Sequence, residues 1–317
     1  MISVTLLVTG KTCAQNQTTI SQYMFNSFLL NPAAAGSEGF TTINMTVRKQ
    51  WVGETGSPSS YLFTAQTRIY KRKFMKGNTE AKKQYVNSVK SGKVGLGFHI
   101  LNENIGIFNH NKMRLAYAYH ISQGKSQISC GLDISLLQYG VNRNKTVVED
   151  DNDKLINESS LQSITSNFNT GIYYSNPKIY AGLSLLNMLK SATSIGPFDG
   201  KYYNQRHVNM IFGYTSTLNS EFVMEPSVYF RMSDIADYQM DATVKLTYDQ
   251  QLWMGTTYRT NQFMVFFGGF KINRLFLGYA YDHNLIPVRM KTFNTHEFMV
   301  SLKLGDNVKR YRWLERY

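Results

Sequence analysis

The sequence predicts an all-β fold, a transmembrane antiparallel β-barrel of the outer-membrane type with about 14 strands. Three observations predict it: many segments alternate between apolar and small or polar residues, the chain opens like a secretory leader, and no spanning helix is present in the sequence. The longest strongly apolar run, residues 264–270, is far shorter than the ~20 residues that a membrane-crossing helix needs. A chain of this kind can cross a membrane only as strands.

Composition narrows the class further. The 317 residues include 34 Lys plus Arg against 21 Asp plus Glu, a net charge of +13, and 43% are hydrophobic. The mean hydropathy of −0.30 is unlike that of a bundle of lipid-buried helices. The 21 Tyr and 19 Phe, with charged residues held to 17%, argue against disorder. Length alone leaves open two ordinary domains or one barrel.

The amino terminus resembles a secretory signal. Residues 2–10 are mostly apolar, Lys11 follows, and Thr12-Cys13-Ala14 is a passable small-residue cleavage site, so residues 1–14 are predicted to be a signal peptide. No Lys or Arg precedes the apolar stretch, which indicates a truncated leader or a misassigned start. A buried first strand is the alternative. Cys13 and Cys130 are the two cysteines, too few for a disulfide framework or a thiolate metal site once the leader is removed.

Alternation with a period of two is the main evidence for strands. It is clearest from residue 241, where one face carries Ala242, Val244, Leu246 and Tyr248 and the other carries Asp241, Thr243, Lys245 and Thr247. Similar segments begin at Val94, Met113, Ile128 and His296. A strand places successive side chains on opposite faces, so each segment has one apolar face.

This pattern predicts strands of roughly ten residues, a length that suits a tilted strand in a bilayer. They are placed near Thr41, Tyr61, Val94, Met113, Lys125, Phe168, Ile179, His207, Glu221, Asp241, Leu252, Gln262, Arg274 and Thr295. A soluble sandwich or propeller would show the same alternation. The barrel is favoured because the polar faces are rich in Gly, Ala, Ser and Thr, and because aromatic residues recur at strand ends, where interfacial girdles lie.

The connections fit the rule that bacterial barrels have short periplasmic turns and longer outer loops. Short turns are expected at residues 122–124, 176–178, 216–220, 249–251 and 271–273, and long outer connections at 140–167, 188–206 and 283–294. Two connections depart from the rule: residues 260–261 form a short outer one, and residues 71–93 form a long inner one.

The long inner connection concentrates positive charge, with seven of the thirteen excess charges. Its candidate partner-binding residues are Lys71, Arg72, Lys73, Lys82 and Lys83, joined on the same predicted side by Arg310 and Arg312 of a basic tail, residues 305–317. One interpretation is a docking surface for an acidic periplasmic partner, and the other is a solvated loop that aids solubility before insertion.

No catalytic or cofactor chemistry is predicted. The six His residues lack metal-ligand spacing, and His99 and His120, on inward faces, are expected to join a polar network in the lumen. No nucleophile elbow, nucleic-acid-binding motif or phosphate loop accompanies them. We therefore expect a protein that is not an enzyme, has no cofactor or metal, binds no nucleic acid and contacts outer-membrane lipid.

Two stretches carry a more specific signal. The first comprises Tyr23-Met24-Phe25-Asn26, Asn31-Pro32-Ala33-Ala34-Ala35-Gly36, Arg48-Lys49-Gln50-Trp51-Val52-Gly53 and Gly56-Ser57-Pro58; the second comprises residues 252–259, 278–282 and 296–302. Together they resemble the PorP/SprF family of Bacteroidetes outer-membrane proteins, over nearly the whole mature chain. Ala34 stands where the family usually has Tyr, and Gly56-Ser57-Pro58 replaces a usual Gly-Ala-Pro.

The resemblance implies a component of the type IX secretion and gliding apparatus in the outer membrane. It implies binding of an exported, adhesin-like surface protein through that protein's type B C-terminal domain, and contact with periplasmic lipoprotein or ring components. Residues 15–40 are expected to be a periplasmic lead-in that plugs the barrel, or a plain hydrophobic lead-in to the first strand, and residues 41–304 the barrel itself. A diffusion channel for small solutes is the alternative function, since Thr42, Asn44, Thr46, Arg48 and Gln50 make a polar inward face.

Overall fold

The computed structural model describes residues 19–69, 93–142, 162–189, 192–194, 201–234, 238–260, 263–285 and 294–304. Within these ranges, no helix is long and apolar enough to cross a membrane. The predicted partner-binding residues Lys71, Arg72, Lys73, Lys82, Lys83, Arg310 and Arg312 lie outside the described residues, as do the predicted signal peptide and the basic tail.

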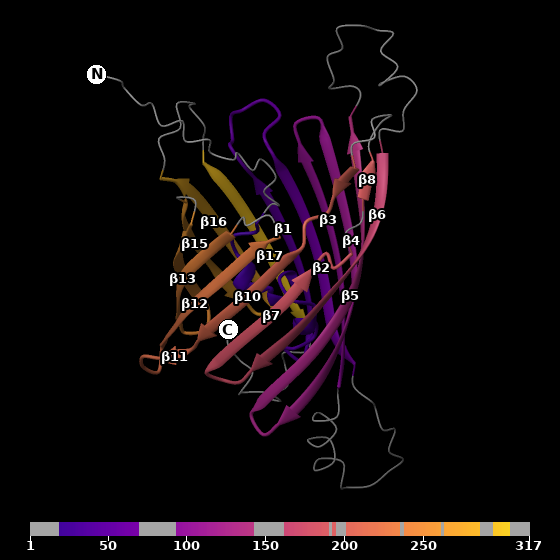
Figure 1. The fold of residues 1–317 in the computed structure, drawn as a ribbon. Coiled ribbons are helices and arrows are strands. Elements are labelled where there is room, and N and C mark those ends of the chain that lie inside the picture. Colours follow the sequence, from indigo (N-terminus) through magenta and orange to yellow (C-terminus); the bar gives the residue numbers. More distant parts are fainter. Residues whose placement is uncertain are drawn as a thin grey trace, which may run out of the picture.

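Fourteen antiparallel strands close into a barrel (Figure 1). They are β1 (Thr41–Lys49), β2 (Ser59–Ile69), β3 (Val94–Ile105), β4 (Phe108–Gln123), β5 (Ser126–Val141), β6 (Gln162–Ser175), β7 (Ile179–Leu186), β10 (His207–Tyr214), β12 (Phe222–Ser233), β13 (Tyr238–Tyr248), β14 (Leu252–Arg259), β15 (Phe263–Ile272), β16 (Leu275–Asn284) and β17 (Thr295–Leu304). The prediction of about fourteen strands is confirmed, and each predicted position falls in or beside its strand.

Three short strands lie outside the main circuit. β8 (Ala192–Ser194) pairs with β9 (Lys201–Tyr203) inside the connection from β7 to β10, and β11 (Ser216–Thr217) adds to the end of β12. The barrel closes at β1 with β17, in the register Thr41↔Leu304 to Lys49↔His296, and is continuous through β10 with β12.

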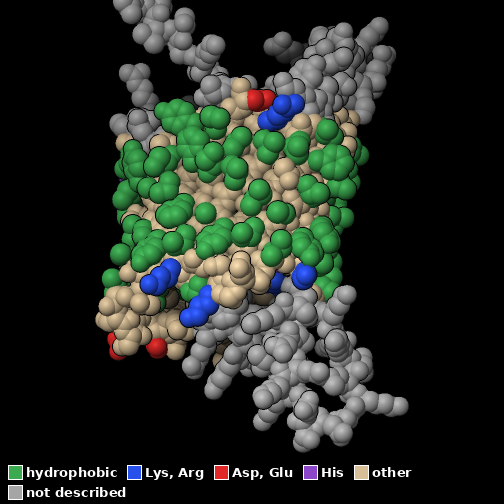
Figure 2. Space-filling view, turned by 60° about the horizontal axis from the view of Figure 1, so that its bottom comes forward, with side chains coloured by type: hydrophobic (Ala, Val, Ile, Leu, Met, Phe, Trp, Pro, Cys, Tyr) green, Lys and Arg blue, Asp and Glu red, His purple; other side chains and the backbone are tan. Residues whose placement is uncertain are grey.

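The apolar faces point outward, as the alternation predicts. On β13, Asp241, Thr243 and Lys245 are buried in the lumen while Val244 is 46% exposed on the outer surface. Figure 2 shows this outer surface as a continuous belt of hydrophobic side chains, with Lys and Arg at its edges. The barrel wall therefore presents apolar side chains to the hydrocarbon outside and polar side chains to the lumen inside.

The barrel ends differ in the way the connection rule predicts. At one end, the turns at residues 124–125, 176–178, 249–251 and 273–274 are short, and at the other the chain makes the long connections 187–206 and 285–294. The exceptions are the long connection 70–93 at the first end and the short connections 106–107 and 260–262 at the second. We call these the short-turn end and the long-loop end; the long-loop end is the outer one in bacterial barrels. The expected connection 140–167 is shorter than predicted, at 142–161, because β5 and β6 continue past the belt.

The outer surface turns polar where β3, β4 and β5 continue toward the long-loop end. Asn102 donates to Asn111 at 2.6 Å, Asn109 to Asn104 at 2.6 Å, and Asn111 to Asn109 at 2.8 Å, so the amides satisfy one another. Amide side chains in this position favour water over hydrocarbon, which marks the edge of the membrane-facing belt. A two-residue turn at Gly106 and Ile107 then joins β3 to β4 beyond the belt.

The lumen is filled by the chain that precedes β1. This luminal segment, residues 19–40, contains three 3₁₀ turns, η1 (Tyr23–Phe25), η2 (Ser27–Leu29) and η3 (Pro32–Ala34), and most of its side chains are buried. Asn31 begins η3 by accepting a hydrogen bond from the Ala33 backbone at 2.9 Å, with Pro32 at the first helical position. The segment runs from the long-loop end, beside Arg48, to the short-turn end, where it enters β1.

Candidate functional site

An ion-pair network holds the luminal segment at the long-loop end. Arg48 on β1 binds Asp282 on β16 at 2.6 Å and Glu297 on β17 at 3.1 Å, with all three side chains almost fully buried. Ser21 joins the network: its hydroxyl accepts from Arg48 at 2.8 Å, and its backbone N–H donates to Glu297 at 2.7 Å. The Gln22 backbone also donates to Glu297, at 2.9 Å. Charge-assisted bonds of this kind fix the segment to three strands at once.

A second pair extends this network along the neighbouring wall. Arg259 on β14 makes a two-nitrogen contact with Asp241 on β13, at 3.0 and 3.1 Å from its Nε and 3.0 Å from its Nη2. Gln239 donates to the same carboxylate at 2.9 Å and accepts from Thr19 at 3.2 Å. Buried carboxylates are thus paired with Arg rather than left exposed to the apolar interior.

In the first part of the segment, residues 21–28, two rings pack on aromatic side chains of the wall. Phe25 lies 5.0 Å from Trp253 on β14, ring centroid to ring centroid, with the Lys245 ammonium 5.1 Å above its face. Tyr23 lies 5.1 Å from Tyr229 on β12. Burial, followed by the nearby Asp241 carboxylate, raises the pKa of the Tyr23 phenol above its usual range, so the phenol stays neutral. We call residues 21–28 the aromatic half.

The second part, residues 30–37, comes into direct contact with the backbone of the wall. A Cβ atom at Gly131 on β5 would overlap the backbone of Ala33, and one at Gly95 on β3 would overlap the carbonyl of Ala35. Glycine is required at these positions because two main chains come into contact there. We call residues 30–37 the glycine half.

Hydrogen bonds complete the contact of the glycine half. The Asn31 amide donates to the backbone oxygens of Ile172 at 2.8 Å and Leu183 at 3.2 Å. The Leu30 carbonyl accepts from Ser184 at 2.6 Å and from Asn209 at 3.2 Å. Neighbouring backbone groups that the turn leaves open are therefore satisfied by the barrel wall.

The short-turn end carries a third set of contacts. His120 on β4 bonds to the Ala35 carbonyl at 3.0 Å and to Ser129 at 2.7 Å, and Lys303 on β17 forms a 3.0 Å ion pair with Glu38. The expectation that His99 and His120 face inward is confirmed, and His120 is part of a polar network. The segment is thus tied to the wall at both ends and in the middle.

The remaining family-motif residues divide between lumen and rim. Met24, Asn26 and Gly36 are buried in the lumen, where Asn26 donates to Thr64 at 2.7 Å. The other four are in the turn from β1 to β2 at the long-loop end, in the order Gln50, Trp51, Gly53 and Pro58. There the Gln50 N–H donates to the Pro58 carbonyl at 2.9 Å, and Trp51 is 46% exposed with a positive φ of 50°.

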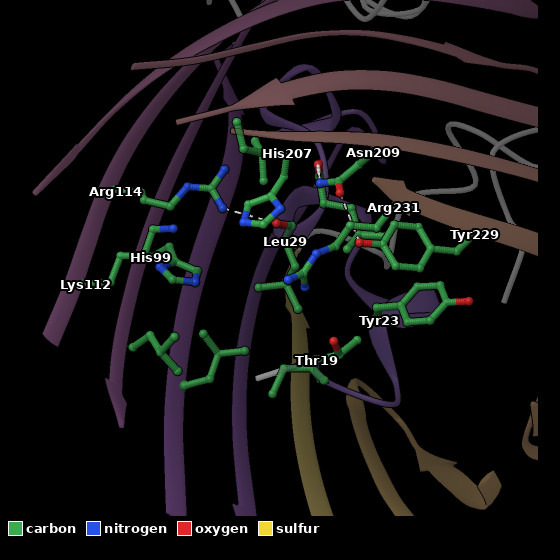
Figure 3. A pocket seen from close by; sticks show the side chains of 15 residues that line it. Thr19, Tyr23, Leu29, His99, Lys112, Arg114, His207, Asn209, Tyr229 and Arg231 are labelled. Carbon is green, nitrogen blue, oxygen red and sulfur yellow. Dashed lines mark hydrogen bonds between the residues drawn. The ribbon is translucent and has the colours of Figure 1, made fainter. Parts of the chain in front are cut away.

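A pocket remains beside the segment on its long-loop side. It has a volume of about 80 Å³, and its wall includes Lys112 and Arg114 of β4, His99 of β3, His207 of β10 and Arg231 of β12. Figure 3 shows the nitrogen ends of these side chains directed toward the same space. Arg114 is occupied by Asp133, at 2.5 Å, and by the Leu29 carbonyl, at 3.1 Å. The sequence interpretation did not single out Lys112 or Arg231. They could have been found as charged residues within spanning strands, which often mark functional sites.

The geometry defines a class of protein: a transmembrane β-barrel of the outer membrane whose lumen is occupied by its own amino-terminal segment. The model of the type IX secretion system membrane protein PorP/SprF family matches residues 12–302. The chain belongs to this family, a membrane component of a secretion system rather than a class of enzymes, and the resemblance drawn from its motifs is confirmed.

Solved structures of low sequence identity are similar in outline. A Pseudomonas aeruginosa FadL homologue has a TM-score of 0.47 and 9% identity, covering 86% of this chain and 92% of that one. The Acinetobacter baumannii outer membrane protein Omp33 has a TM-score of 0.46 and 6% identity, with 84% and 98% covered. The Pseudomonas putida toluene transporter TodX has a TM-score of 0.43 and 8% identity, with 87% and 91% covered. The search of curated protein sequences found no match.

Proposed function

We propose that this barrel binds an exported, adhesin-like protein through that protein's type B C-terminal domain and anchors it at the cell surface. The filled lumen is the observation that carries the proposal. A segment fixed by ion pairs at Arg48, by aromatic packing at Phe25 and by backbone contact at Gly131 occupies the interior of the described barrel. A barrel with a filled lumen suits a membrane anchor for a partner that binds from the outer side.

The β1–β2 turn, residues 50–58, offers a docking surface at the long-loop end. Trp51 and Val52 are exposed there, and the Gly106 N–H donates to the Gly56 carbonyl at 3.0 Å, which ties the turn to its neighbour. A rigid turn that presents an exposed Trp has the composition of a binding hot spot, since aromatic anchors contribute most of the affinity at protein interfaces.

Affinity purification of the barrel in mild detergent from its native cells tests this proposal. We expect a large surface protein to co-purify, and Trp51→Ala to reduce its recovery by about tenfold or more, as loss of a hot-spot Trp does. The matched control is Leu218→Ala, which removes an exposed apolar side chain at the short-turn end. Recovery of the wild-type barrel alone would contradict the proposal.

A diffusion channel is the second candidate, because the inward side chains Thr42, Asn44 and Thr46 are polar and buried in the lumen. Planar-bilayer recordings separate the two functions. The anchoring proposal expects a nearly silent wild-type barrel, and a steady open conductance would favour the channel.

We also propose that the basic connection and tail contact periplasmic machinery. The supporting feature is the charge concentrated in Lys71, Arg72, Lys73, Lys82 and Lys83. Replacing these five residues with Gln should leave insertion intact and weaken a periplasmic association. Added salt should weaken the wild-type association as well, because it screens contacts of this kind. An unchanged pull-down at physiological salt would count against this contact.

A further inference from the structure

The pocket beside the luminal segment combines positive charge with an apolar wall. Lys112, Arg114 and Arg231 supply three cations, and none of the described residues that line the pocket is acidic. Leucines form the rest of its surface: Leu29, Leu30, Leu62, Leu101 and Leu186. A site of this composition is suited to a small group that carries both a negative charge and hydrocarbon.

Two of the three cations in the pocket, Lys112 and Arg231, make no ion pair with a described carboxylate. Asp133 pairs with Arg114, but no described carboxylate lies within ion-pair distance of Lys112 or Arg231. The Lys112 side chain is 6% exposed and Arg231 is 9% exposed. The Lys112 ammonium is repelled by the nearby Arg114 and Arg231 and is partly compensated by the Asp133 and Glu103 carboxylates. A buried cation without an ion pair of its own favours an anion beside it, because the anion offsets the cost of burying the charge.

Two histidines add unused hydrogen-bonding atoms to the same space. The Nδ1 atoms of His99 and His207 are buried and make no hydrogen bond with any described group. Each ring lies close enough to a pocket cation to interact with it, His99 with Lys112 and His207 with Arg231. Buried polar atoms without a partner are rare in folded proteins, so these two ring nitrogens are available to a group that enters the pocket.

We propose that this pocket binds the carboxyl-terminal residue of the exported partner, its α-carboxylate on Lys112 and Arg231 and its apolar side chain on the leucine wall. The inference rests on the proposed anchoring function and adds a recognition chemistry to it. An α-carboxylate and a side chain share one carbon atom, so a chain end places charge and hydrocarbon together as the pocket requires.

The position of the pocket favours a chain end over an internal acidic residue. It lies inside the barrel mouth on the long-loop side, next to Thr19 and Leu186, with room for several water molecules by volume. A chain end reaches such a site as a single strand, whereas an internal residue needs two strands to pass the mouth. Capture of terminal carboxylates by clustered donors is an established mode of peptide recognition.

Peptide binding to the purified barrel in detergent tests the proposal. The probe is a fluorescein-labelled heptapeptide that ends in leucine with a free carboxylate, compared by anisotropy with its C-terminal amide. We expect the amide to bind at least about tenfold more weakly, and Lys112→Gln and Arg231→Gln each to weaken the acid by about tenfold or more, because each removes a charge-assisted hydrogen bond. Lys125→Gln, an exposed lysine at the short-turn end, is the matched control and should change nothing.

Several outcomes would overturn the proposal. Equal binding of the acid and the amide would exclude carboxylate recognition. Inorganic phosphate that binds the barrel without displacing the peptide would show that the peptide does not use the anion site. The acid-amide comparison uses the wild-type barrel, so it decides the matter even where a variant fails to fold.

Co-purification from native cells separates this inference from the anchoring function. If wild type and the double variant Lys112→Gln, Arg231→Gln capture the surface protein equally, the anchoring function stands and the pocket inference fails. If wild type captures no surface protein, the anchoring function itself fails.

Discussion

The two halves of the luminal segment are held in the barrel by different kinds of contact. The aromatic half, residues 21–28, packs ring against ring on β12 to β14 and is tethered by the Arg48 ion pairs. The glycine half, residues 30–37, lies directly on the backbone of β3 to β6 and makes short hydrogen bonds to it. Side chains can rearrange around a smaller neighbour, but two main chains in contact cannot make room for an added atom. We therefore expect the aromatic half to be destabilised when atoms are removed, and the glycine half when atoms are added.

The largest loss of stability is expected from Arg48→Met, which removes the β1 side chain that binds the start of the aromatic half. It leaves the buried carboxylates of Asp282 and Glu297 facing each other, with Arg259 still 3.7 Å from Asp282. Breaking a buried pair in this way costs about 3–5 kcal/mol. Urea unfolding in micelles, followed by the heat-dependent gel shift, measures the loss. The exposed Arg206→Met is the control, and equal unfolding of both variants would show that the network adds no stability.

Phe25→Ala should come next, at about 3 kcal/mol, the lower end of the range for a Phe lost from a core. The change opens a cavity between Trp253 and Lys245. Hydrogen exchange measured by mass spectrometry should show faster exchange in residues 21–28, with residues 30–37 still protected. Phe266→Ala, on the lipid face, is the control. Uniform loosening of both halves would contradict the division.

Gly131→Ala tests the other half by adding a single carbon. The new Cβ would overlap the backbone of Ala33, at a cost of about 1–3 kcal/mol, and the segment must shift to relieve it. Exchange should now rise in residues 30–37, and conductance should appear in planar bilayers. Gly268→Ala makes the same change where the nearest atom would be 3.3 Å away, and should have a much smaller effect. A silent Gly131→Ala barrel with unchanged exchange would refute the backbone-contact account.

Ser184→Ala should give the smallest effect, about 1 kcal/mol or less. It removes the bond to the Leu30 carbonyl, but Asn209 still donates to that oxygen. Removing both donors, with Ser184→Ala and Asn209→Ala together, should cost more than the sum of the single changes, since the carbonyl is then buried without a partner. Additive losses in the unfolding free energy would mean that water replaces the donors.

Strand positions and faces were predictable from the sequence because membrane and lumen impose opposite requirements on alternate residues. Val244 and Lys245 are adjacent and point to the two environments, so alternation alone assigns them. Connection lengths distinguished the two ends of the barrel, because bacterial barrels have short periplasmic turns and longer outer loops. The family motif also drew attention to Tyr23, Phe25 and Asn31, which are all buried in the lumen.

The inward aromatic residues were not predictable by the same rule. Trp253, Val265 and Phe267 face the lumen, although an apolar face was assigned to the lipid. They lie inward because the luminal segment brings its own apolar side chains to that wall, a contact between residues more than 200 positions apart. The pocket was missed for a related reason: Lys112 and Arg231 meet across the lumen, and alternation within one strand carries no information about what stands opposite.

Closure of the barrel has a consequence for its assembly. The first and last strands meet with Arg48 opposite Glu297 in the ladder, and both residues bind Ser21. The residues that pair the first and last strands are thus the ones that bind the luminal segment. We therefore expect the last strand pairing and the filling of the interior to be coupled during assembly.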